Sequence, residues 1–362
     1  MKKLLLASVA VSGLALAAAP AHAEVNLELG GYFKGYGAFV NQDETTGTDV
    51  NSFDLLRDTE LHFTGETTLD NGLTVGAHAE FQVDGDDGTA TADESYAYFS
   101  GSWGRVNFGN EDGAAFLLQV AAPSADSNID GIRQYIQPFA NTGGMGNLSG
   151  TGTQLDYDMD ISAKADKLTY LSPIMSGFQV GVSYSPEVGD TVTDTSGVGS
   201  STTAGTTYQE TYEVSARYEG QVQNVGVIVG AGYARRNRDN TTALLGDNTA
   251  WNVGLNLGFG PFGVGVAYVA DDLGLDGANE ADRDTLVVGL DYTTGAFKVG
   301  ASYYNQDNDN GIEYDRYTAG VTYEYGPGMT FRGSIQQVEV DNVTGTADAD
   351  GTALLLGTQV NF

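Results

Sequence analysis

Cysteine is absent from the 362-residue chain, and basic residues and histidines are scarce. Without cysteine there is no disulfide framework, no thiolate nucleophile and no Cys-based zinc site. The 16 lysines and arginines stand against 48 aspartates and glutamates, so the formal net charge of −32 opposes nucleic-acid binding and attracts cations. After the N-terminal region no run of about 18 consecutive apolar residues occurs, which excludes a later transmembrane helix.

The N-terminal region has the layout of a cleaved secretory signal. In "MKKLLLASVAVSGLALAAAPAHAE", Lys2 and Lys3 precede an apolar run, and Ala21-His22-Ala23 forms a small-residue cleavage site. We expect residues 1–23 to be removed and a mature domain of residues 24–362 to leave the cytoplasm.

Glycine and aromatic residues are abundant, with 50 glycines, 20 tyrosines and 15 phenylalanines. They alternate with period two, as in "WNVGLNLGFGPFGVGVAYVA" (251–270), which turns at Gly260-Pro261 and so predicts a hairpin. The last residues, 351–362, alternate in the same way and end on Phe362. A terminal aromatic ring on the apolar side of a strand indicates that something buries it.

This alternation predicts an all-β chain of sixteen antiparallel strands. We expect strands at about 25–40, 53–68, 73–83, 93–100, 104–110, 164–172, 177–185, 209–219, 224–235, 250–259, 262–270, 283–293, 296–304, 313–325, 329–340 and 352–362. Short turns and long acidic connections alternate strictly between them. An even number of such strands, with short turns at one end, is typical of a transmembrane β-barrel.

Aromatic residues on the predicted outward faces support this interpretation. Five strands carry two rings six residues apart, as expected for two aromatic girdles at the membrane surfaces. The pairs are Phe178 and Tyr184, Tyr212 and Tyr218, Phe262 and Tyr268, Phe297 and Tyr303, and Tyr317 and Tyr323. The alternative is a soluble sandwich with aromatic inner faces, but a sandwich has no need to place all its long loops at one end.

With these features the chain resembles the general porins of Gram-negative bacteria, particularly the sixteen-stranded type of alphaproteobacteria. The resemblance covers residues 24–362 and rests on "EVNLELGGYFKGYGAF", "ESYAYFSGSWGRVNFGNEDGA", "SPIMSGFQVGVSYS" and the terminal "LGTQVNF". It implies the cell outer membrane, with its lipid and lipopolysaccharide, and homotrimers of water-filled pores. It also implies insertion by the barrel assembly machinery through the last strand, and a third loop folded into each barrel as a constriction.

The longest connection, about residues 111–164, is the candidate constriction. It is too apolar for a solvated loop, and its apolar side chains are expected to pack on the inner wall. The constriction charges that we single out are Glu111, Asp112, Asp126, Asp130 and Arg133. The alternative is an acidic loop on the outer surface.

The parity of the strands also predicts which charges line the wall. Carboxylates and bases are nearly balanced there, and the candidate lining residues are Lys34, His62, His78, Glu80, Arg217, Lys298, Arg316 and Arg332. In related porins an arginine cluster on the wall opposes acids on the loop, whereas this wall is mixed. Because the loop adds mostly acids, we expect a cation-preferring channel.

The two histidines beyond the signal lie on either side of the Asp70-Asn71-Gly72 turn. An inward position for both requires Leu69 to pair with Leu73, which sets His62 opposite Glu80 and His78 opposite Thr64. A cross-strand ion pair is the simplest interpretation, and a metal site or the base of an outer-membrane hydrolase is the alternative. No cofactor is expected, although acidic loops such as Asp84, Asp86 and Asp87 are suited to weak calcium binding.

Small residues dominate the outward positions that we assign on the first three strands. Because small residues permit close backbone approach, we place the subunit interface of the homotrimer at Gly31, Gly35, Gly37, Gly65, Ala77 and Ala79. The sequence therefore predicts an outer-membrane porin for passive diffusion of ions and small hydrophilic solutes, and not an enzyme. The alternatives are a substrate-selective channel, an outer-membrane enzyme or an adhesin.

Overall fold

The structure is a computed structural model, and it describes the chain in segments. These are residues 25–44, 47–84, 90–124, 129–140, 142, 145, 155–188, 208–238, 246–274, 282–309, 311–342 and 348–362. The predicted signal peptide, Asp86, Asp87 and Asp126 lie outside the described residues, as does the side chain of Asp130.

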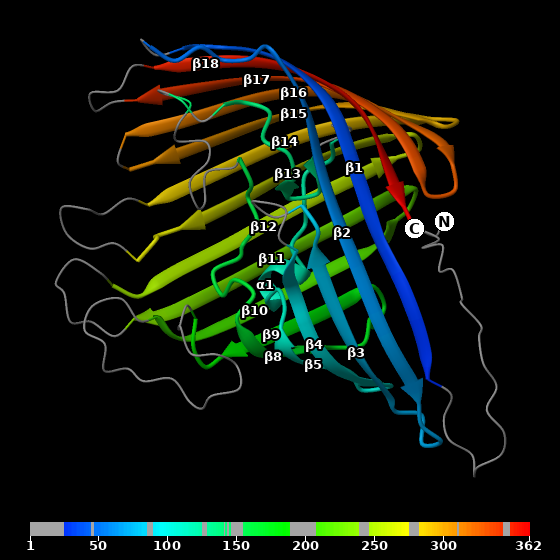
Figure 1. Cartoon of the computed structure of the whole chain (residues 1–362). Coiled ribbons are helices and arrows are strands. Elements are labelled where there is room, and N and C mark those ends of the chain that lie inside the picture. Colours follow the sequence, from blue (N-terminus) through cyan, green and yellow to red (C-terminus); the bar gives the residue numbers. More distant parts are fainter. Residues whose placement is uncertain are drawn as a thin grey trace.

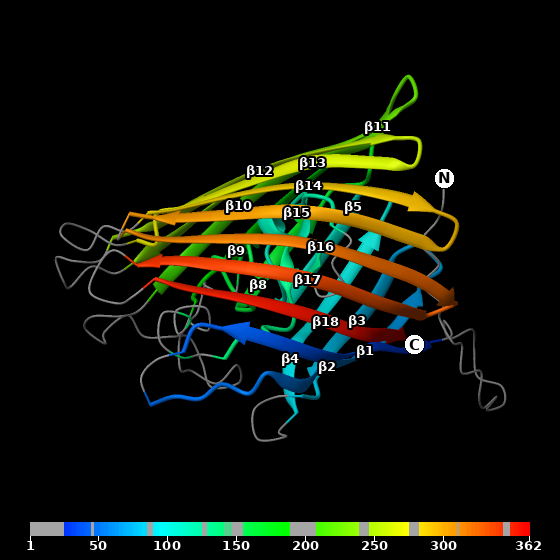
Figure 2. The same ribbon diagram turned by 90° about the horizontal axis from the view of Figure 1, so that it is seen from above.

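Sixteen antiparallel strands form a closed barrel, as predicted (Figures 1 and 2). They are β1 (Asn26–Gln42), β2 (Phe53–Thr68), β3 (Thr74–Gln82), β4 (Thr91–Gly101), β5 (Gly104–Asn110), β8 (Asp166–Leu171), β9 (Phe178–Ser185), β10 (Tyr208–Val222), β11 (Val225–Arg238), β12 (Asn248–Phe259), β13 (Phe262–Asp271), β14 (Arg283–Thr294), β15 (Phe297–Asn308), β16 (Ile312–Gly326), β17 (Met329–Asn342) and β18 (Ala349–Asn361). Between β5 and β8 the chain forms a short helix, α1 (Ala114–Leu117), and a small hairpin of β6 (Ile129–Asp130) and β7 (Arg133–Gln134). Among the described residues, no helix is both long enough and apolar enough to cross a membrane.

The barrel closes where its two ends meet. β18 pairs antiparallel with β1, with Asn361 opposite Tyr32, and the Phe362 N–H donates to the Gly31 carbonyl at 3.1 Å. Figure 1 shows blue β1 beside red β18. Every strand therefore has two neighbours, and the backbone donors and acceptors of the sheet need no solvent.

The two faces of the sheet have the reverse of the polarity found in a soluble protein. Outward Leu290 is 57% exposed, whereas inward Gln336 is completely buried. The period-two pattern explains this arrangement, because successive side chains of a strand point to opposite faces. An apolar outer surface around a polar interior is the arrangement that a bilayer requires.

The rings of the predicted aromatic pairs contact rings on neighbouring strands, among them Tyr292 and Trp251, which were not in the predicted pairs. Near the short turns the rings of Phe178 and Tyr218, Phe262 and Tyr292, and Phe297 and Tyr323 have centroids 4.6–4.8 Å apart. Near the other ends of the strands, Tyr184 pairs with Tyr212, Trp251 with Tyr268, and Tyr303 with Tyr317, at 5.0–5.2 Å. The rings thus form two bands on the outer surface.

One predicted connection is wrong. We expected a long acidic loop between the strands at 296–304 and 313–325, but β15 continues to Asn308 and β16 begins at Ile312. Polar residues extend this hairpin, since backbone pairing needs no apolar side chain, and the Asn305 side chain donates to Glu313 Oε1 at 2.8 Å. The alternation of short and long connections is therefore not strict.

Candidate pore constriction

The connection between β5 and β8, which we call the third loop, enters the barrel. Figure 1 shows α1 within the ring of strands. The loop buries Ile136, Phe139, Leu155 and other apolar side chains in a cluster with inward residues of β13–β18 and β1. The expectation that apolar residues hold the loop against the inner wall is confirmed for the described residues.

Inward glycines make room for the first part of the loop. A Cβ atom on Gly230 of β11 would lie 2.8 Å from Val120 Cγ2, and one on Gly265 of β13 would lie 2.8 Å from Pro123 Cδ. On Gly289 of β14 it would overlap the Pro123 carbonyl. These strands therefore carry a row of glycines because the loop backbone packs directly on the sheet.

Polar side chains of the wall satisfy the loop backbone. Ala114 N–H donates to Ser183 Oγ at 2.7 Å, Ala115 N–H donates to Glu213 Oε2 at 2.9 Å, and Ser215 Oγ donates to the Ala114 carbonyl at 2.6 Å. Further along, the Asn256 side chain donates to the Ala121 carbonyl at 2.7 Å. Buried backbone groups need such partners, so these contacts fix the path of α1 and the residues after it.

Two bases that the sequence places on the wall are buried beneath the loop. Arg316 is 1% exposed; it donates to Gln134 Oε1 and, at 3.1 Å, to the Leu155 carbonyl. Lys34 is also 1% exposed, and its ammonium lies 2.9 Å from the centre of the Tyr135 ring. We expected both to line the water-filled lumen, but the loop covers them, and they hold it in place.

Arg133 lies among carboxylates in the loop. Its guanidinium is 2.9 Å from Asp158 and 3.5 and 3.7 Å from Asp112 and Asp160. Burial raises the pKa of Asp160 to about 8, with nearby Asp112 and Asp158 adding to the rise. Burial also raises the pKa of Glu111 and of Asp156 to about 7 each. The loop therefore carries several carboxyl groups whose charge changes near neutral pH.

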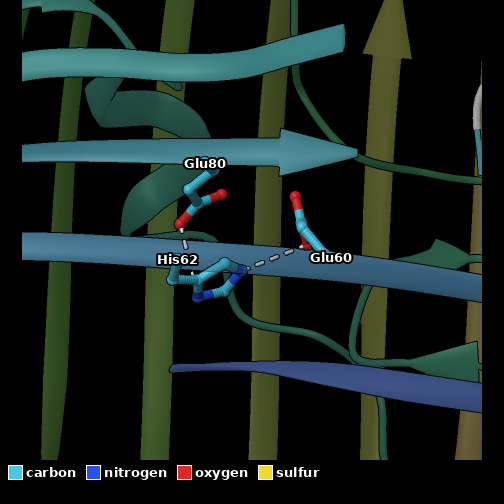
Figure 3. Close-up of side chains that lie close together, drawn as sticks. All are labelled: Glu60, His62 and Glu80. Atoms are coloured by element: carbon cyan, nitrogen blue, oxygen red, sulfur yellow. Dashed lines mark ion pairs between the residues drawn. The ribbon is translucent and has the colours of Figure 1, made fainter. Parts of the chain in front are cut away.

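Strands β2–β4 carry a second acidic cluster. Glu60 and His62 come from β2 and Glu80 from β3 (Figure 3). His78 of β3 and Glu94 of β4 lie beside them. The predicted register is confirmed, because His62 lies opposite Glu80 and His78 opposite Thr64. His78 Nε2 is 2.8 Å from Glu80 Oε1, and Lys164 at the end of the loop pairs with Asp93 and with Glu94. The end of the loop thus contacts the wall through ion pairs with carboxylates of β4.

Comparison with known proteins now identifies the family. The family model described as "Gram-negative porin" matches residues 7–343. The chain belongs to the Gram-negative porin family. Its location is accordingly the outer membrane.

Relatives of this porin are distant in sequence. A porin refined at 1.8 Å is 20% identical, with a TM-score of 0.61 over 93% of this chain and 100% of that one. The anion-selective porin from Comamonas acidovorans is 16% identical, with a TM-score of 0.66 over 94% and 100%. An uncharacterized protein of Rickettsia typhi is 25% identical over 217 residues, which are 53% of this chain and about half, 49%, of that protein. The solved structures support the fold.

The remaining predicted lining residues of this porin are engaged in local contacts. Lys298 Nζ is 3.1 Å from Asp291 and donates to the Ser124 carbonyl at 2.7 Å. Arg217 pairs with Glu219 at 3.2 Å, and Arg332 donates to Thr330 Oγ1 at 2.9 Å. Of the bases that we placed in the pore, Lys298 also holds the loop.

The sequence reasoning missed several residues that shape this site. Glu94 was not singled out, although it has inward parity on its strand. Tyr135 was expected to pack on the inner wall, but not to lie against the Lys34 ammonium. The inward glycines were read only as part of the alternation. A row of glycines at inward positions of consecutive strands is the signal that indicates a segment packed on the inner wall.

Proposed function

We propose that this porin is a passive diffusion channel for ions and small hydrophilic solutes, with a preference for cations set at the third loop. The proposal rests on the position of the third loop inside the barrel, where Lys164 at the end of the loop pairs with Asp93 and Glu94 of β4. A loop in this position narrows the lumen, and the charges at its edge act on every ion that passes.

The uneven use of acids and bases supports the cation preference. The loop covers Lys34 and Arg316, and Lys298 is paired with Asp291. Glu80 and Glu94 lie beside His78 and Lys164 and remain partly exposed. In the described part of the loop, Asp112, Asp158 and Asp160 surround the single guanidinium of Arg133. Negative potential at a constriction concentrates cations. The Comamonas acidovorans porin is anion-selective, so the shared fold does not decide the sign.

The test is the zero-current potential of the purified protein in a planar bilayer under a KCl gradient, with a chelator present. We expect a cationic sign in about 0.1 M salt that fades near 1 M, because the Debye length falls from about 10 Å to about 3 Å. Changing Glu80 and Glu94 together to Gln should reduce the potential, whereas Asp350→Asn on the outward parity of β18 should not. An anionic potential in dilute salt contradicts the proposal.

A substrate-selective channel is distinguished in the same apparatus. In that case one kind of small sugar would saturate and block the conductance, whereas a diffusion pore conducts in the presence of each sugar. The match to the Gram-negative porin family favours a channel over an enzyme, even though Thr64 Oγ1 lies 2.7 Å from His78 Nδ1. We therefore propose a channel and not a catalyst.

We further propose that the protein is exported by a cleaved signal, inserted through its C-terminal strand and assembled as a homotrimer. A groove of about 710 Å³ on the outer face of β1–β5 supports the interface. Gly65, Ala77 and Ala79 line it, and exposed Phe63 and Phe108 flank them, so its sides are more aromatic than we predicted. Ala77→Trp should weaken the oligomer on unheated gels. Equal weakening by Val264→Trp on β13 would contradict this interface.

A further inference from the structure

The histidine and glutamate side chains of β2 and β3 form an arrangement that a general diffusion pore does not need. Glu60, His62 and Glu80 each offer a ligand atom within 4.8 Å of the others, and Figure 3 shows them converging. His78, Glu80 and Glu94 form a second such triad that shares Glu80. Both histidines beyond residue 24 thus point to one glutamate on the wall of the lumen.

The contacts of His62 leave room for a ligand. His62 Nε2 lies 3.3 Å from Glu60 Oε2 and is shielded from solvent, yet it makes no hydrogen bond of acceptable geometry. His62 Nδ1 lies 3.7 Å from Glu80 Oε1, beyond hydrogen-bonding distance. An ion can bind only one of the two His62 nitrogens, and one such nitrogen lies within 4.8 Å of a Glu60 oxygen and a Glu80 oxygen. Ligand atoms of a tetrahedral zinc ion are about 3.3 Å apart, as follows from metal bonds of about 2.0–2.2 Å. Small side-chain movements therefore suffice for the three groups to bind one small cation.

Neighbouring residues orient the cluster. His78 Nδ1 is 2.7 Å from Thr64 Oγ1, and its Nε2 is 2.8 Å from Glu80 Oε1, so His78 holds one oxygen of the Glu80 carboxylate. In the second triad Glu94 is 3.3 Å from the Lys164 ammonium, which competes with a metal ion. The first triad is the better site, with His78 as a positioning residue for Glu80.

We propose that Glu60, His62 and Glu80 bind one divalent transition-metal ion of the zinc class, and that the bound ion narrows the pore. An imidazole with two carboxylates suits zinc or copper, whereas calcium and magnesium prefer oxygen ligands alone. Solutes in the lumen reach the edge of this cluster, because the His62 side chain is 32% exposed although its Nε2 is shielded. Metal binding by this site does not depend on channel activity, whereas the narrowing of the pore by the bound ion rests on the proposed function.

Binding is tested by equilibrium dialysis of the folded full chain in detergent, after chelator treatment, against ZnCl2 at pH 7. We expect one ion per chain, and at least tenfold weaker binding for His62→Gln, with a smaller loss for His78→Gln. Glu28→Gln, which removes an inward carboxylate from β1, is the matched control and should bind as the unchanged protein does. A difference in gel mobility between unheated and heated samples establishes that each variant is folded.

The results that overturn the site are equal zinc binding by folded His62→Gln, or equal displacement of zinc by the same concentration of magnesium. In planar bilayers, micromolar zinc should reduce the conductance of the unchanged protein and not of His62→Gln. Binding without that reduction overturns the narrowing alone. A protein that binds zinc but conducts no ions contradicts the proposed function and leaves the metal site standing.

Discussion

The inner wall of the barrel has two halves that differ in what covers them. Strands β9–β18 face the third loop with small or apolar inward residues such as Gly230, Gly289 and Val338, which pack against it. Strands β2–β4 instead carry a cluster of acids and histidines, of which His62, Glu80 and Glu94 remain partly exposed. The period-two pattern is the same in both halves, so the difference lies in the inward side chains: glycines and apolar residues predominate where the loop packs.

The largest expected effect comes from filling the space that the inward glycines of the covered half leave for the third loop. In Gly289→Val the new side chain would overlap the Pro123 carbonyl, and overpacking of this kind costs about 1–3 kcal/mol. Since the loop is less constrained than the closed sheet, we expect the loop to move and single-channel conductance to rise. The measurement is conductance in 1 M KCl.

Gly258→Val is the matched control for this change. Gly258 is also inward, on β12, but the nearest neighbouring atom to a Cβ there is 4.0 Å away. We expect its conductance to match that of the unchanged protein. If both valine variants raise the conductance equally, the glycine row does not hold the loop.

A smaller effect should follow from loss of a buried anchor in the covered half. Arg316→Met removes the donors to Gln134 and to the Leu155 carbonyl, and each buried group left without a partner costs about 1–3 kcal/mol. We expect faster proteolytic cleavage within the third loop while the barrel stays folded. Arg217→Met, which removes a cation that pairs with Glu219 on the same strand, should be cleaved at the original rate; equally fast cleavage of Arg217→Met would contradict the anchoring.

The side chains that point into the barrel were largely predictable from the sequence, because the alternation of a β-strand is a local property. The register at Leu69 and Leu73 follows from requiring both histidines to face inward, and the structure has it. Parity, however, shows only the side to which a residue points. It does not show what covers that side, so Lys34 and Arg316 were assigned to the lumen although the loop buries them. The path of the loop depends on contacts between residues more than 100 positions apart, such as Asn252 with Ala115.

The smallest expected effect is a pH dependence of selectivity at the edge of the covered half. The pKa values of Glu111 and Asp156 are raised to about 7, and that of Asp160 to about 8, mainly by burial. These groups are neutral below about pH 6 and ionise as pH rises to 9, so the constriction gains negative charge. The cationic zero-current potential in dilute KCl should therefore increase over this range.

The stability of the docked loop should change with pH in the opposite direction and fall as pH rises. Because the folded pKa values lie above the ordinary value of about 4, the stabilisation of the docked loop by these protonated groups is complete below pH 4. It is lost as pH rises through 7 and 8. Asp160→Asn should reduce the increase in zero-current potential at the higher pH values, whereas Asp350→Asn on β18 should leave the pH dependence of the potential unaltered. A potential that is constant from pH 6 to 9 in the unchanged protein would mean that these carboxyl groups do not face the conduction path, and that the acids of β2–β4 set the selectivity alone.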